Sequence, residues 1–122
     1  MARVSKDTTE SVKDLGVALD RSSTLEDYTV NFVTIREASD LAPLLAGLPG
    51  GHCSCPHWGY LLAGEMTIRY GDEVETIVPG DAFYLPPGHT PAAAAGTEFV
   101  QFSPADLLAE TEAAMAAAMQ AH

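Results

Sequence analysis

Hydrophobic and polar positions divide this chain of 122 residues into three parts. Residues 1–27 are mostly polar and predict an N-terminal arm or a short helix. From Tyr28 to Arg36, β-branched and aromatic residues alternate with polar ones, which is typical of a strand. Residues 40–51 combine two Pro and three Gly with a Leu-rich patch, so we expect a packed loop or a single helical turn there.

Turn residues then recur at short intervals and separate runs of five to eight strand-forming residues. The turns are Gly64-Glu65, Gly71-Asp72, Pro79-Gly80-Asp81, Pro86-Pro87-Gly88 and Gly96-Thr97. Short strands at such spacing indicate an antiparallel barrel or sandwich. We therefore predict an all-β domain over residues 28–103, built as an antiparallel barrel or sandwich.

The last part of the chain, residues 104–122, changes to a helical pattern. Ser103 offers an N-cap and Pro104 suits the first helical position. The Leu- and Ala-rich sequence that follows predicts a C-terminal α-helix. One face of that helix, expected to pack on the barrel or on a partner subunit, presents Leu108, Met115 and Met119.

Charge and composition exclude several classes of function. The formal net charge is −11, with six basic and 17 acidic residues. Nucleic acid and anionic membrane surfaces both require clustered Lys and Arg, so we expect neither as a partner. The sequence shows no membrane span and no signal peptide. We therefore expect a cytoplasmic protein, in which cysteines stay reduced or bind metal.

Ligand-capable side chains cluster at the start of the strand-rich part. Cys53, Cys55 and His57 are spaced two residues apart. Side chains two apart on a strand share a face, so we expect all three to point into the barrel. His52 has the opposite parity and is expected to face outward. A second candidate, His89, follows the Pro86-Pro87-Gly88 corner.

Glycine and proline spacing around these candidates resembles the cupin superfamily over roughly half of the chain. The positions that match the two cupin motifs are Gly64, Gly80, Pro86 and Gly88. The resemblance implies that residues 28–103 form a single antiparallel β-barrel of the jelly-roll type. The stretch 53–60 also resembles a group of small bacterial cupins with a Cys-x-Cys-Pro-His-Trp-Gly-Tyr signature.

The metal-binding positions of the cupin motifs carry different residues here. His57 stands where cupins have Glu, and Cys53 stands where they have the second His. Gly51 replaces the first His and Pro91 the last, with His89 two residues earlier on the same face. The common site of three His and one Glu is therefore absent. We predict a rebuilt metal site formed by Cys53, Cys55, His57 and His89.

The chemistry of these ligands leaves several hypotheses open. Two thiolates and two neutral imidazoles would neutralise a divalent ion and fill a tetrahedral shell, as in structural zinc sites. If Cys55 stays outside, one Cys and two His leave an open position for water or a substrate. Soft ligands favour zinc, with copper or iron as alternatives. The competing hypotheses are a metal-free polar pocket, a strained Cys53–Cys55 disulfide and a Cys–His nucleophile.

The expected inner face of the barrel predicts a pocket for a small-molecule ligand. Its predicted lining is Leu61, Phe83, Tyr84 and Leu85. Trp58 and Tyr60 have the opposite parity, and we expect them to cover a homodimer interface, which is usual in cupins; the alternative is that they pack under the loop of residues 40–50. The function we predict is a metal-binding cupin with an unassigned reaction. The alternatives are a metal-free cupin that binds a small molecule in an apolar pocket, and a structural or interaction protein whose fold is stabilised by the metal.

Overall fold

The computed structural model describes residues 3–51 and 53–120. Within them, the strands are β1 (Ser11–Asp14), β2 (Ala18–Leu25), β3 (Tyr28–Ile35), β4 (Ser39–Asp40), β5 (His57–Ala63), β6 (Met66–Tyr70), β7 (Glu73–Ile77), β8 (Ala82–Leu85), β9 (Thr90–Ala93) and β10 (Glu98–Pro104). The helices are α1 (Ala42–Leu45), a 3₁₀ turn (Pro49–Gly51) and α2 (Ala105–Gln120).

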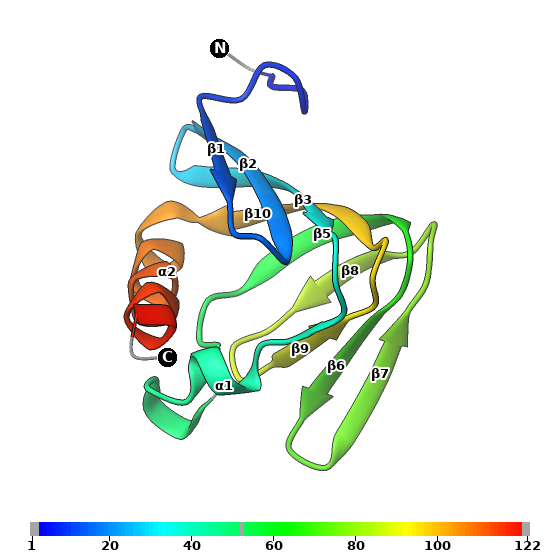
Figure 1. Cartoon of the computed structure of the whole chain (residues 1–122), viewed down its shortest axis with the longest axis vertical. Coiled ribbons are helices and arrows are strands. Elements are labelled where there is room, and N and C mark those ends of the chain that lie inside the picture. Colours follow the sequence, from blue (N-terminus) through cyan, green and yellow to red (C-terminus); the bar gives the residue numbers. More distant parts are fainter. Residues whose placement is uncertain (1–2, 52, 121–122) are drawn as a thin grey trace.

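Two antiparallel sheets form the barrel (Figure 1). The larger sheet has the order β1-β2-β3-β10-β5-β8, and the smaller one has the order β4-β9-β6-β7. From β5 onward the chain passes repeatedly between the sheets, and each of the five predicted turns joins two strands. The prediction of an all-β jelly-roll barrel with a C-terminal helix is therefore confirmed.

One half of the barrel interior, here called the packed half, is filled by apolar side chains. Its members are Leu61, Met66, Ile68, Ile77, Phe83 and Leu85. They come from both sheets and follow the strand alternation that places every second residue inside. Close packing also explains why residue 59 is a glycine, because a Cβ there would clash with the Phe83 ring and would lie 2.6 Å from the Val100 carbonyl oxygen.

The N-terminal part differs from its prediction, because residues 11–14 and 18–25 form strands rather than a loose arm or a helix. β2 pairs with β3 along its whole length, from Ala18↔Ile35 to Leu25↔Tyr28. This pairing satisfies the backbone groups that β3 would otherwise expose at the sheet edge. The sequence signal is weak because the inward positions of β2 include Asp20, which lines a cavity instead of an apolar core.

The C-terminal helix covers the end of the barrel that carries the two cysteines. α2 begins at Ala105, and Ser103 and Pro104 belong to β10 instead of capping the helix. Leu108 is buried against Cys53 and Cys55, and Met115 packs on the same cluster, whereas Met119 is exposed. Neither helix in the described part of the chain is long and apolar enough to cross a lipid bilayer.

Candidate metal centre and its cavity

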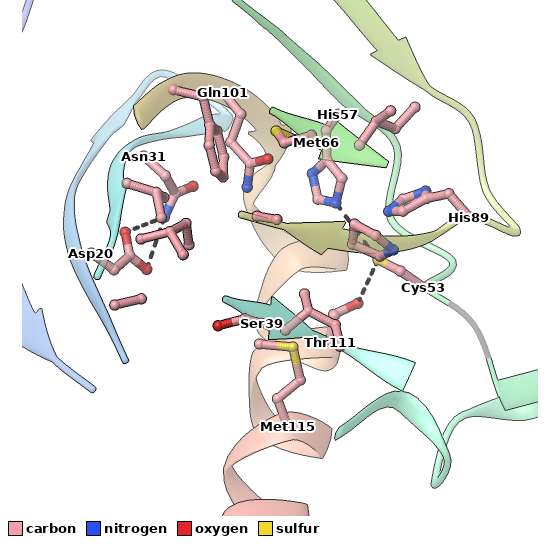
Figure 2. A pocket seen from close by; sticks show the side chains of 18 of the residues that line it. Asp20, Asn31, Ser39, Cys53, His57, Met66, His89, Gln101, Thr111 and Met115 are labelled. Atoms are coloured by element: carbon pink, nitrogen blue, oxygen red, sulfur yellow. Dashed lines mark hydrogen bonds between the residues drawn. The ribbon is translucent and has the colours of Figure 1, made fainter. Parts of the chain in front are cut away.

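Three of the four predicted ligands meet at one end of the barrel interior (Figure 2). Cys53 and His89 form an isolated antiparallel bridge, in which the Cys53 amide donates to the His89 carbonyl at 2.9 Å. His57 is the first residue of β5 and points toward them. The exposed fraction is 3% for Cys53, 1% for His89 and 5% for His57. The ligand atoms of the three residues all lie within 4.8 Å of one another.

Hydrogen bonds orient both imidazole rings of this group. His57 Nδ1 lies 2.6 Å from Ser103 Oγ, while its Nε2 lies 3.6 Å from Cys53 Sγ. His89 Nδ1 donates to the Pro86 carbonyl at 2.8 Å, so Nε2 is the ring nitrogen that would bind a metal. Two ligands of one tetrahedral zinc ion stand about 3.5 Å apart, given bond lengths of about 2.0–2.3 Å. The sulfur–nitrogen separation therefore fits a shared ion.

Burial sets the protonation states of these groups. Burial, assisted by the neighbouring His89, lowers the pKa of His57 to about 3, so this imidazole is neutral at ordinary pH. Burial raises the pKa of the Cys53 thiol, although hydrogen bonds with the Cys55 backbone and with Thr111 act in the opposite direction. A neutral imidazole is ready to bind a metal, whereas Cys53 would have to release its proton on binding.

The fourth predicted ligand, Cys55, is not brought into this group. Regular strand geometry begins only at His57, so the parity argument does not extend back across residues 54–56. The Cys55 thiol donates to the Pro56 carbonyl at 3.5 Å and is buried beside Leu45 and Leu108. Burial raises its pKa to about 12. The expectation for His52 lies outside the described residues.

A cavity of about 170 Å³ opens beside the three ligands. It is lined by Cys53, His57 and His89 and mostly by apolar side chains, among them Val33, Met66, Leu85 and Phe99. Of the predicted lining, Leu85 is in place. Leu61 and Phe83 belong to the packed half. Tyr84 lies on the outer face, because it alternates with the inward Phe83 and Leu85.

Sequence reasoning missed the polar residues that line another part of this cavity. Asp20 on β2, Asn31 on β3 and Gln101 on β10 line it, and we call these three the polar wall. Gln101 is the register partner of Asn31, whose Nδ2 donates to Asp20 Oδ1 at 3.0 Å. The three strands are distant in sequence, so only their register in the sheet brings these residues together.

The outer face of the larger sheet carries the aromatic residues predicted to face away from the cavity. Trp58 and Tyr60 are exposed, as expected from their parity. Trp58 stacks on Tyr84 with ring centroids 4.6 Å apart. The homodimer interface expected on this face stays a prediction.

The sequence matches no model of a known protein family and no curated protein. Several solved structures are similar to the chain as a whole. The polyketide cyclase RemF from Streptomyces resistomycificus has a TM-score of 0.60 at 15% identity, over 86% of this chain and 80% of RemF. An RmlC-like cupin from Shewanella frigidimarina has a TM-score of 0.57 at 16% identity, over 83% of this chain and 88% of that protein.

KdgF from Halomonas is a third similar structure, with a TM-score of 0.52 at 18% identity, over 78% of this chain and 86% of KdgF. At such low identities the likeness defines the fold and not the activity. The chain thus has the jelly-roll fold of the cupins. That fold and the buried Cys53, His57 and His89 group fit a metal-binding cupin.

Proposed function

We propose that the protein is a cupin that binds one transition-metal ion through Cys53, His57 and His89. The observation that carries this proposal is the convergence of three buried ligand atoms within 4.8 Å of one another. One thiolate and two neutral imidazoles would leave a charge of +1 on a divalent ion. Zinc suits this ligand set best, with copper or iron as alternatives.

The proposed site keeps one coordination position open toward the cavity. Three protein ligands and an open fourth position are typical of catalytic zinc sites, whereas structural sites are closed by four protein ligands. Cys55 supports this assignment, because it is buried in the neighbouring apolar cluster and its thiol donates to a backbone carbonyl. A bound ion would supply a Lewis acid beside the cavity. Ser103 and the Pro86 carbonyl would hold the two imidazoles in place.

Elemental analysis of protein purified without chelator and reloaded under reducing conditions tests this function. We expect about one metal ion per chain in the parent protein and in Cys55→Ser, and almost none in Cys53→Ser. The two variants make the same chemical change at buried cysteines two residues apart, so Cys55→Ser is the matched control. A parent protein that takes up no zinc, copper or iron contradicts the metal site. Equal loss in both variants would instead indicate a closed site of four ligands.

A metal-free cupin that binds a small molecule is the second candidate. It is favoured by the largely apolar lining of the cavity. Ligands that raise the melting temperature equally with and without chelator would support this alternative.

A further inference from the structure

The polar wall of the cavity contains a buried acceptor that the protein leaves unsatisfied. Asn31 is only 2% exposed, and its Nδ2 donates to both carboxylate oxygens of Asp20, at 3.0 and 3.3 Å. Its Oδ1 has no hydrogen-bond partner among the residues that the structure describes. A buried carbonyl oxygen without a donor costs free energy, so such groups usually meet a bound molecule or water.

The same cavity has more acidic groups than cations. Asp20 and Glu112 both line it, and burial raises the pKa of both carboxyls. Lys13 is the cation near both carboxylates. Its Nζ lies 3.8 Å from Glu112 Oε2, and Lys13 is the register partner of Asp20. Asp20 itself forms no salt bridge within residues 3–51 and 53–120. The wall therefore favours a cation or a hydrogen-bond donor and repels an anion.

We propose that the polar wall binds the ammonium group of a small primary amine. This inference rests on the proposed function only in that the cavity admits a small molecule. An ammonium group has three N–H donors, and the wall has three side chains that carry acceptor oxygens: Asp20, Asn31 and Gln101. The apolar lining, which includes Val33 and Phe99, would contact the carbon chain.

The arrangement in Figure 2 also orients such a molecule. Asp20 and Asn31 lie on one side of the cavity and Cys53 and His57 on the other, with the amide of Gln101 between them. An amine held at the polar wall would therefore extend its far end toward the candidate metal centre. The volume of about 170 Å³ restricts the ligand to a short chain.

Three probes of similar size and different charge test the inference: butylamine, butanol and butyrate. Binding would be measured by calorimetry or by ligand-detected NMR, on chelator-treated protein. We expect butylamine to bind roughly tenfold more tightly than butanol, because its hydrogen bonds are charge-assisted, and butyrate not to bind. Butanol that binds as tightly as butylamine, or any preference for butyrate, overturns the proposal.

Two variants assign the binding to the wall. Asp20→Asn removes the charge and keeps an oxygen that can accept the Asn31 hydrogen bond, and we expect a roughly tenfold loss of butylamine affinity or more. Asn31→Leu removes the unsatisfied acceptor at similar volume and should weaken binding too. Asp72→Asn, at an exposed turn, is the control for the change in net charge and should bind like the parent.

Unchanged butylamine binding in Asp20→Asn overturns the proposal, and this variant decides the test if Asn31→Leu does not fold. Melting curves recorded without ligand show whether each variant is folded. Because the probes are tested without metal, the outcome is separate from the metal analysis. If the protein binds butylamine but takes up no metal, the amine proposal holds and the metal site is contradicted. If the protein takes up metal but does not bind butylamine, the metal site holds and the amine proposal is contradicted.

Discussion

The barrel interior has two unlike halves: the packed half, and a hollow half that holds the cavity with the polar wall and the three candidate ligands. β5 contributes to both, because His57 and Leu61 are four residues apart on the same face of this strand. Leu61 is fully buried among apolar side chains, while His57 faces a thiol and a hydroxyl. The comparison shows that one strand can contribute to an apolar core at one end and to a buried group of polar side chains at the other.

The two halves also differ in what holds their side chains. Packing fills the apolar half, whereas polar groups in the hollow half are held by hydrogen bonds: Ser103 meets His57, the Pro86 carbonyl accepts from His89, and Asn31 donates to Asp20. Burying such groups costs free energy that hydrogen bonds only partly return. We infer that the packed half stabilises the fold and offsets the cost of the hollow half.

The largest effect should come from a cavity in the packed half. Leu61→Ala removes a fully buried side chain, and we expect it to lower the free energy of unfolding by about 2–5 kcal/mol. Urea denaturation measures this loss. Val74→Ala is the control, because Val74 is 62% exposed and its truncation should change stability by less than about 0.5 kcal/mol. If folded Leu61→Ala loses the metal that the parent binds, the two halves are not separable.

A smaller effect, on metal affinity rather than on the fold, should follow Ser103→Ala. This variant removes the hydroxyl 2.6 Å from His57 Nδ1, so the ring loses the partner that orients it. If the proposed centre is correct, metal affinity should fall by about 10–100-fold. Competition with a chromogenic chelator measures it. Ser54→Ala, at an exposed serine beside Cys53, should bind metal like the parent. Equal affinities in the two variants would mean that Ser103 does not support the site.

The sequence predicted the features that depend on neighbouring residues. Turn-forming glycines and prolines marked the strand ends of residues 64–97, and the spacing of Cys53 and His57 indicated a common site with His89. Trp58 and Tyr60 were correctly placed outside, because β5 is regular over these residues. Such features require only local backbone geometry.

Features that depend on register or on irregular backbone could not be predicted in this way. Asp20, Asn31 and Gln101 come from three strands, and nothing local distinguishes them from surface residues. Ser103 suits a helix N-cap in the sequence, yet β10 continues past it and its hydroxyl meets His57. Cys55 leaves the ligand group because residues 54–56 are not part of a strand. Tertiary structure thus overrode a local preference at Ser103.

The smallest effect should appear in the pH dependence of stability, and it tests whether the polar wall costs free energy. Burial raises the pKa of Asp20 above its usual 3.8, although the hydrogen bond from Asn31 and the charge of Lys13 act in the opposite direction. Between the two pKa values the folded state binds more protons than the unfolded state. The contribution of Asp20 to the stability of the parent should therefore fall as pH rises through this window, and the penalty should stay constant above it.

Asp20→Asn removes this penalty, so without amine it should be more stable than the parent near pH 7, within the ~0.5–2 kcal/mol common for single stabilising substitutions. The advantage should shrink toward zero as the pH falls below 3.8, where Asp20 is protonated in both states. Urea denaturation at a series of pH values measures it, with Asp72→Asn as the exposed control. A difference that does not change with pH would show that the Asp20 carboxylate is not destabilised by burial. The polar wall would then resemble an ordinary surface, and the contrast between the two halves would rest on the candidate metal centre alone.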